Sequence, residues 1–223
     1  MIRVFIGYDE TEAAAYHVCV ESIIRHANQP VQIVPLAKNM LKGICDDTQR
    51  DGSNAFIYSR FFVPYLCDFD GYAIWIDGDM LLQTDIAELW AERSGTHAVS
   101  VVRHEYKTKH PKKYRGADNP DYPRKNWSSV ILWNCGHPSN RKLTPKYIAE
   151  HDGKHLHRLA WLDDNEINGL PRYWNWLVRE FNDNPRAKLL HYTIGIPAFP
   201  EYQDDHHADE WHETLERVMR CDY

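Results

Sequence analysis

Short, wholly apolar segments alternate along this chain with longer segments whose apolar residues recur every three or four positions. Residues 72–76 (YAIWI) are typical of a buried strand, whereas residues 10–27 carry the spacing of an amphipathic helix. The predicted buried face of that helix is Ala15, Val18, Cys19, Ser22 and Ile23. Such alternation favours an α/β fold. The sequence therefore predicts a central, mostly parallel mixed sheet flanked by helices, in a single domain over residues 1–223.

Turn residues and helix caps divide the chain into the remaining elements. Strands are expected at residues 3–8, 31–36, 72–76, 98–102, 129–133 and 188–191. Helices are expected at residues 10–27, 61–66, 85–90, 143–150, 163–168 and 209–219, with residues 39–54 polar and irregular. No repeat or low-complexity segment interrupts this order.

The charge of the chain argues against one class of partner. The formal net charge is -6, so the basic surface that binds nucleic acid is not expected. Aromatic residues make up 13%, which fits either a bulky core or surfaces on which sugar rings stack. One basic segment, residues 104–125, is either a solvated loop or a flap that faces an anion. It carries Lys107, Lys109, Lys112, Lys113, Arg115, Arg124 and Lys125.

The cysteines and the apolar segments indicate the compartment. The five cysteines include no C-x-x-C pair and are odd in number, which argues against a disulfide framework or a zinc site and fits a reducing compartment. The amino-terminal segment MIRVFIGYDE predicts a strand rather than a signal peptide. Because no apolar run approaches the ~20 residues of a membrane span, we expect a cytoplasmic protein without a transmembrane segment.

An acidic pair follows the strand at residues 72–76. Gly78 separates Asp77 from Asp79, and residues at positions i and i+2 of a strand face the same side. Both carboxylates can therefore reach one hard cation, such as Mn²⁺ or Mg²⁺. Gly78 has no Cβ, which lets a ligand approach the backbone closely. The alternative is a solvated turn with two incidental acids.

Other polar residues also stand at the ends of predicted strands. Tyr8 and Asp9 come at the end of the first strand, and His191 ends the last one. In open α/β sheets, ligands bind outside the carboxyl ends of the strands. We therefore expect these residues to gather around one site, although a lone histidine in such a place is also commonly a hydrogen-bonded structural residue.

Residues 56–90 combine a Y-x-R motif, a proline, a strand ending in D-x-D and a D-I-x-x-L motif. The residues concerned are Tyr58, Arg60, Pro64, Asp77, Asp79, Asp85, Ile86 and Leu89. This order resembles the core of family 8 glycosyltransferases and their GT-A-fold relatives, the glycogenin-like and lipopolysaccharide galactosyltransferase-like enzymes. Further segments resemble the family in the same order, namely 127–134 (WSSVILWN), 162–168 (LDDNEIN), 170–175 (LPRYWN) and 190–195 (LHYTIG). The resemblance implies a GT-A, Rossmann-like nucleotide-diphospho-sugar transferase fold.

The resemblance also implies roles for individual residues. A divalent cation, Mn²⁺ or Mg²⁺, is expected on Asp77, Asp79 and His191. Asp163 or Asp164 is expected to be catalytic, with its carboxylate beside the anomeric carbon, where it would stabilise positive charge. The residues expected to bind the nucleotide-sugar are Gly7, Tyr8, Asp9, Tyr58, Arg60, Asp77, Gly78, Asp79, Ser128, Ser129 and Gly195. In this set Tyr8 stacks on uracil, Arg60 clamps the diphosphate and Gly195 lies in a phosphate-binding loop.

The activity implied by the resemblance is transfer of a hexose from a UDP-sugar to a glycan or another hydroxyl acceptor, with retention of anomeric configuration. UDP-glucose or UDP-galactose is the expected donor. Two other interpretations stay open from the residues. One is a phosphatase of the haloacid-dehalogenase type, in which the first aspartate of D-x-D is a nucleophile. The other is a non-catalytic module that binds a nucleotide-sugar.

Overall fold

The structure is a computed structural model that describes residues 1–44 and 57–220. The segment predicted to be irregular spans residues 39–54, and residues 45–54 of it lie outside the described residues. The strands are β1 (Ile2–Gly7), β2 (Val31–Leu36), β3 (Tyr72–Ile76), β4 (Met80–Leu82), β5 (Val99–Val102), β6 (Val130–Asn134), β7 (Ile167–Leu170), β8 (Trp176–Leu177) and β9 (Leu189–His191). The α-helices are α1 (Ala13–His26), α2 (Val63–Leu66), α3 (Ile86–Ala91), α4 (Pro145–Glu150), α5 (Gly153–His157) and α6 (Ala208–Val218).

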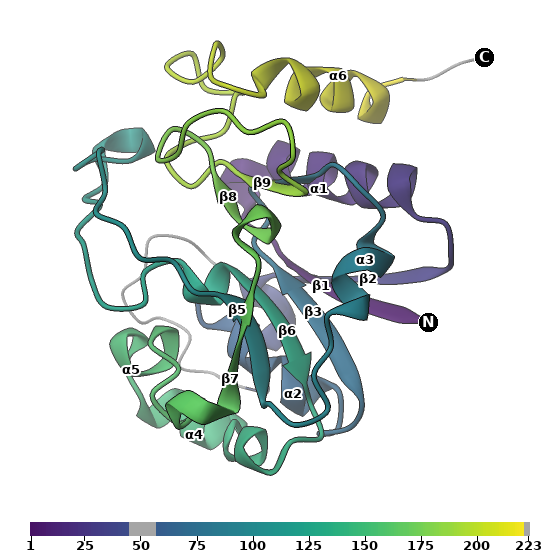
Figure 1. The fold of residues 1–223 in the computed structure, drawn as a ribbon, viewed down its shortest axis with the longest axis vertical. Coiled ribbons are helices and arrows are strands. Elements are labelled where there is room, and N and C mark those ends of the chain that lie inside the picture. Colours follow the sequence, from purple (N-terminus) through teal and green to yellow (C-terminus); the bar gives the residue numbers. More distant parts are fainter. Residues whose placement is uncertain (45–56, 221–223) are drawn as a thin grey trace.

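The main sheet has the strand order β2-β1-β3-β6-β5-β7 (Figure 1). Strand β6 pairs antiparallel with both β3 and β5, and the other pairings in this sheet are parallel. The predicted mostly parallel mixed sheet is therefore confirmed. In β3, Ile74, Trp75 and Ile76 are all 0% exposed, and burying such a side chain stabilises the fold by about 1.5–3 kcal/mol. The strand that leads into the acidic pair is thus firmly anchored.

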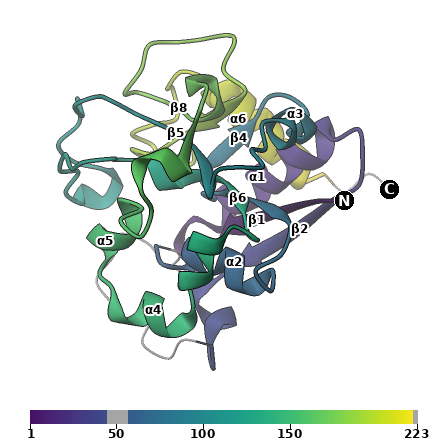
Figure 2. The ribbon, with the colours of Figure 1, turned by 60° about the horizontal axis from the view of Figure 1, so that its bottom comes forward.

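Helices cover both faces of the main sheet. On one face, Trp75 and Trp133 share a core with Val63 of α2, Ile148 of α4 and Leu156 of α5. On the other face, Ile74, Ile76 and Leu132 share a core with Cys19 of α1 and Leu89 of α3. The terminal helix α6 lies along the outer side of α1 (Figure 2). The buried face predicted for α1 is confirmed residue by residue.

A second, small sheet was not expected from the sequence. Its strand order is β4-β9-β8, with β4 antiparallel to β9 and β8 parallel to β9. The first residue of β4, Met80, pairs with the last residue of β9, His191. Strand β4 follows directly on Asp79, so this pairing carries a residue from near the end of the chain to the acidic pair.

The helix predicted at residues 163–168 is wrong. The chain forms a short 3-10 turn at Asp164–Glu166 and then the strand β7. Pro171 disfavours the helical conformation at the residue before it, and Gly169 has a low helix propensity. Residues Ile167–Leu170 instead extend the sheet by pairing with β5. Helix α1 also begins later than predicted, because Glu10–Glu12 form a separate 3-10 turn.

Two further expectations concern the cysteines and the membrane. Cys19, Cys67 and Cys135 are buried and free, whereas Cys45 and Cys221 lie outside the described residues. Within residues 1–44 and 57–220, no helix has the length and apolar character required to cross a membrane.

Candidate active site

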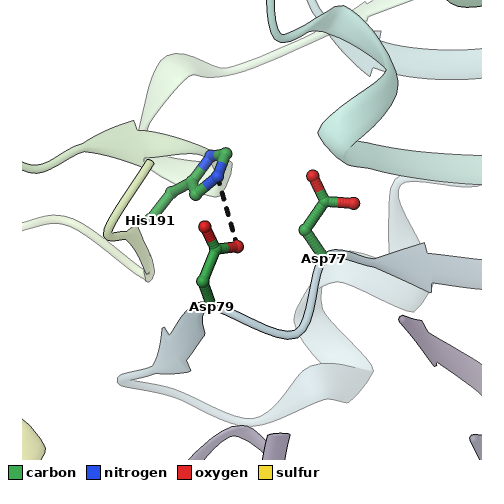
Figure 3. A group of neighbouring side chains, drawn as sticks. All are labelled: Asp77, Asp79 and His191. Carbon is green, nitrogen blue, oxygen red and sulfur yellow. Dashed lines mark ion pairs between the residues drawn. The ribbon is translucent and has the colours of Figure 1, made fainter. Parts of the chain in front are cut away.

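Asp77, Asp79 and His191 form one cluster at the carboxyl edge of the main sheet. Each offers a ligand atom, and these atoms all lie within 4.8 Å of one another. Figure 3 shows Asp77 just beyond the end of a strand, with Asp79 and the imidazole of His191 opposite it. Asp77 is 6% exposed and His191 is 2% exposed. The expected meeting of these three side chains is confirmed as geometry.

Gly78 allows the turn between the two aspartates to lie against the end of β1. A Cβ at residue 78 would stand 2.3 Å from the carbonyl oxygen of Gly7, which is closer than real atoms approach. The glycine is therefore required by packing of one backbone against another. This reason differs from the predicted one, which was access for a ligand. The same contact places the end of β1, where Tyr8 and Asp9 follow, beside the acidic pair.

The carboxylate of Asp77 is held from several sides. Arg60 Nη1 lies 3.0 Å from Asp77 Oδ1, and the indole Nε1–H of Trp75 donates to the same oxygen at 2.9 Å. Arg60 also donates to the backbone carbonyl of Ser128 at 2.7 Å. Burial raises the pKa of Asp77, while the charge of Arg60 opposes that rise. Arg60 thus orients the Asp77 carboxylate and neutralises its charge. The sequence predicted that Arg60 binds the diphosphate, and it did not predict this contact with Asp77.

The imidazole of His191 is oriented by a buried amide. Its Nδ1 lies 2.8 Å from Oδ1 of Asn175, which is 0% exposed. The amide nitrogen of Asn175 donates to the Asn126 carbonyl at 3.1 Å, which leaves its oxygen toward His191. Because that oxygen only accepts, Nδ1 carries a proton, and Nε2 points to Asp79 Oδ1 at 3.4 Å. Sequence reasoning did not assign this role to Asn175, although it lies in the LPRYWN segment.

These three residues fit a divalent cation. Asp79 Oδ1 is buried and has no hydrogen-bond partner of good geometry among the described residues. A carboxylate that already accepts hydrogen bonds, as Asp77 does, keeps further lone pairs for a metal. Two carboxylates and one imidazole held by its other nitrogen form a donor set typical of metal sites. Burial acts to raise the pKa of Asp79, but His191 and Lys113 act in the opposite sense and leave that pKa lowered.

Two charged residues beside this cluster were not predicted as site residues. Glu12 accepts a hydrogen bond from the Tyr114 hydroxyl at 2.8 Å, and burial together with the charge of Asp79 raises the pKa of Glu12 to about 7. Lys113 interacts electrostatically with Asp79, Asp77 and Glu12. Burial lowers the pKa of Lys113 against the effect of these carboxylates. The only sequence signal for Lys113 was the basic composition of residues 104–125.

The residues expected around the nucleoside lie next to the acidic pair. Tyr8 is half-buried, and its ring meets that of Tyr16 edge to face with centroids 5.3 Å apart. Asp9 is 8% exposed and accepts hydrogen bonds from the Thr11 backbone N–H at 2.9 Å and from its hydroxyl at 2.8 Å. Asp9 therefore caps the turn that precedes α1, in addition to any contact with a ligand.

The two serines of the WSSVILWN segment are buried beside Asp77. The carbonyl of Ser129 accepts from the Asp77 backbone N–H at 3.1 Å. The hydroxyl of Ser128 lies 2.7 Å from Nδ1 of His157. Both serines are therefore at the site, where their backbone carbonyls hold Asp77 and Arg60.

Tyr58 and Gly195 have mainly structural contacts. Tyr58 is half-buried against the core, and its hydroxyl lies close to Gly153 at the start of α5. The backbone N–H of Gly195 donates to the Tyr192 carbonyl at 3.0 Å. A Cβ at residue 195 would stand 2.0 Å from the ring of Tyr202. Packing against that ring accounts for this glycine, and its N–H is engaged within a turn.

Asp163 and Asp164 are not brought to the cluster. They precede Ile167, which pairs with Val99 and so lies level with the first residues of β3. Asp77 follows the last residue of β3, which is at the opposite end of the strands. Both are exposed, and Asp164 forms an ion pair with Arg124. The catalytic role expected for them stays a prediction.

Solved structures with the same architecture include GT-A glycosyltransferases. The bifunctional glycosyltransferase WbbM aligns with a TM-score of 0.65 and 18% identity over 98% of this chain and 51% of that one. GlyE of Streptococcus pneumoniae gives 0.62 and 15% over 98% and 63% of the two chains. The galactosyltransferase LgtC gives 0.61 and 13% over 99% and 98%. The chain thus spans about half of WbbM and under two thirds of GlyE, and the fold is that of GT-A glycosyltransferases.

A curated relative identifies the family. The chain is 40% identical over 226 residues to Protein CDI of Arabidopsis thaliana, covering 98% of this chain and 87% of that protein, and it belongs to the same family. No model of a protein family matches the chain.

Proposed function

We propose that this chain is a metal-dependent glycosyltransferase that moves a hexose from a UDP-sugar, such as UDP-glucose or UDP-galactose, to a hydroxyl acceptor. The observation that carries the proposal is the cluster of Asp77, Asp79 and His191 at the carboxyl edge of a GT-A sheet. Ligand sites of open α/β sheets lie at this edge. The buried, oriented donor atoms are suited to Mn²⁺ or Mg²⁺ rather than to a solvated turn.

Each side chain of the cluster has a defined part in this proposal. Asp77 and Asp79 would hold the cation through carboxylate oxygens and His191 through Nε2. The bound cation supplies electrostatic stabilisation of the departing diphosphate. Arg60 keeps the Asp77 carboxylate in place through its 3.0 Å contact, and Asn175 keeps Nε2 of His191 directed at the site. Retention of anomeric configuration is part of the proposal, with the acceptor hydroxyl approaching from the face that the diphosphate leaves.

The phosphatase interpretation is less well supported. In that chemistry the first aspartate of D-x-D attacks phosphorus, which requires a free carboxylate oxygen. Asp77 Oδ1 contacts both Trp75 Nε1 and Arg60 Nη1, and Oδ2 lies 3.3 Å from the same Arg60 atom. These contacts orient the carboxylate and still leave lone pairs on it, so the preference for a glycosyltransferase rests on the fold and on the full three-residue cluster. The solved structures of this fold described above are glycosyltransferases.

The experiment is a donor screen that measures UDP release from UDP-glucose and UDP-galactose with Mn²⁺, with and without hydroxyl acceptors. We expect metal-dependent release by the wild type and none by Asp77→Asn or Asp79→Asn, with unchanged circular dichroism. Asp204→Asn changes an exposed aspartate and is the matched control. Full turnover in either active-site variant would refute the metal role. Hydrolysis of p-nitrophenyl phosphate in place of UDP-sugar turnover would indicate a phosphatase. Tight UDP-sugar binding without release would indicate the non-catalytic module.

A further inference from the structure

The basic side chains of residues 104–125 have different surroundings. Lys112 pairs with Asp118 at 2.5 Å, Lys125 lies 3.8 Å from Asp121, and Arg124 pairs with Asp164. Lys107, Lys109 and Arg115 are exposed. Lys113 instead reaches the loop that follows His191, where its Nζ donates to Thr193 Oγ1 at 3.3 Å. It also interacts with the carboxylates of Asp77 and Asp79. One lysine of this segment therefore belongs to the candidate active site.

A tight hairpin fixes the position of Lys113. The Lys113 backbone N–H donates to the Ala117 carbonyl at 2.8 Å, and Lys112 and Asp118 form an isolated β-bridge. The turn between them passes through Gly116, whose φ is +72° and therefore suits glycine. These contacts make residues 112–118 a defined hairpin.

The hairpin is attached to the site through its next residue, Tyr114. The Tyr114 backbone N–H donates to the Ile194 carbonyl at 2.9 Å. Its ring stacks on Phe199 with centroids 5.2 Å apart and an interplanar angle of 15°. Its hydroxyl donates to Glu12 at 2.8 Å. Lys113 is thus held next to the metal ligands by contacts that do not involve its own charge.

The charges of the site show what kind of ligand Lys113 suits. Asp9, Glu12, Asp77, Asp79 and Glu180 contribute -5 when ionised, and Arg60, Lys113 and Lys125 contribute +3, which leaves -2. A divalent cation brings this sum to 0, and protonation of Glu12 makes it +1. The loaded site therefore no longer repels an anion, and Lys113 supplies a local positive charge. Among the described residues Lys113 Nζ makes only the hydrogen bond to Thr193, and an ammonium has three donors, so two of them can bind anionic oxygens.

We propose that Lys113 binds the phosphate oxygens of the donor's diphosphate, beside the divalent cation. This inference rests on the proposed function. Lys113 thus interacts with the leaving group. Its hairpin is remote in sequence from both segments that carry the proposed metal ligands. A ligand with two linked phosphates would suit this site, because one phosphate would contact the cation and the other would contact the ammonium of Lys113. In the absence of nucleotide, the ammonium of Lys113 also competes with the metal for the carboxylates of Asp77 and Asp79.

The test measures Mn²⁺ and nucleotide binding separately by calorimetry with the full chain. Lys113→Met keeps much of the length of the side chain without its charge. We expect Mn²⁺ alone to bind this variant at least as tightly as the wild type, because a competing cation is gone. UDP in the presence of Mn²⁺ should bind about 10- to 100-fold more weakly, because a charge-assisted hydrogen bond is lost. The ratio of UDP affinity to UMP affinity should be smaller in the variant than in the wild type.

Two further variants separate charge from packing. Lys107→Met removes an exposed lysine of the same segment, outside the hairpin, and should leave UDP affinity unchanged. Lys113→Arg keeps a cation and should retain most of the affinity that Lys113→Met loses. Equal UDP affinity in Lys113→Met and wild type would show that Lys113 only neutralises the carboxylates and would overturn the inference. A wild type that binds neither Mn²⁺ nor UDP would instead overturn the proposed function and, with it, this inference.

Discussion

His104 should make the protein sensitive to mild acid. It follows β5 by two residues, is 5% exposed, and has no hydrogen-bond partner for either ring nitrogen among the described residues. Its ring lies against those of Tyr106 and Phe181, with centroids 6.0 Å and 5.7 Å away. Burial lowers the pKa of His104 to about 3, and the charges of His191 and Arg172 act in the same direction. The folded protein therefore keeps this ring neutral.

The size of the effect follows from the difference between the pKa of about 3 in the folded state and 6.5 in the unfolded state. Below pH 6.5 the His104 side chain is protonated in the unfolded chain but stays neutral in the folded one. Its contribution to the free energy of unfolding is therefore present above this pH and is lost as the pH falls. One pH unit corresponds to about 1.4 kcal/mol. Between pH 7.5 and pH 5, His104 should thus lower the free energy of unfolding by about 2 kcal/mol.

The assay is urea unfolding of wild type and His104→Phe at several pH values from 7.5 to 5. Phenylalanine suits the aromatic surroundings and cannot be protonated, so the loss of stability over this range should be about 2 kcal/mol smaller in the variant. His157, whose pKa burial also lowers to about 3, is present in both proteins, so its contribution cancels. His17→Gln changes an exposed histidine and should follow the wild type. Equal pH dependence in wild type and His104→Phe would refute the reasoning.

Two other predictions follow from single contacts. Asn175→Leu removes the acceptor for Nδ1 of His191, so Mn²⁺ affinity measured by calorimetry should fall about 10- to 100-fold; unchanged affinity would show that the amide does not orient the ring. Gly78→Ala places a Cβ 2.3 Å from the Gly7 carbonyl oxygen and should lower the unfolding free energy by about 1–3 kcal/mol. In Gly136→Ala the nearest atom is 3.7 Å away, so equal melting temperatures for the two alanine variants would contradict that explanation.

Local patterns determine much of the main sheet and its helices. The strand at residues 72–76 is apolar throughout because it is covered on both faces, and the buried residues of α1 recur at helical spacing because one face packs on the sheet. The position of Asp77 at the end of that strand was therefore predictable. The strand at residues 188–191 was also predictable from its short apolar run, which placed His191 at a strand end.

Other parts of the site depend on contacts between distant segments. Strands β4 and β9 have three residues each, too few for a periodic pattern, and only their mutual pairing brings His191 to Asp79. A motif can place Arg60 near the site, but the Ser128 carbonyl and Asp77 decide where its guanidinium lies. Lys113 was one of several basic residues in its segment, and only the contact of its Nζ with Thr193 distinguishes it.

Anomalous X-ray diffraction from crystals of the full chain grown with Mn²⁺ and UDP would locate the metal itself. We expect one anomalous peak per chain, about 2.0–2.3 Å from a carboxylate oxygen of Asp77, a carboxylate oxygen of Asp79 and Nε2 of His191, with diphosphate density between the peak and Lys113. A peak bound elsewhere on the chain, or clear UDP density with no metal among these three side chains, would contradict the proposed metal site.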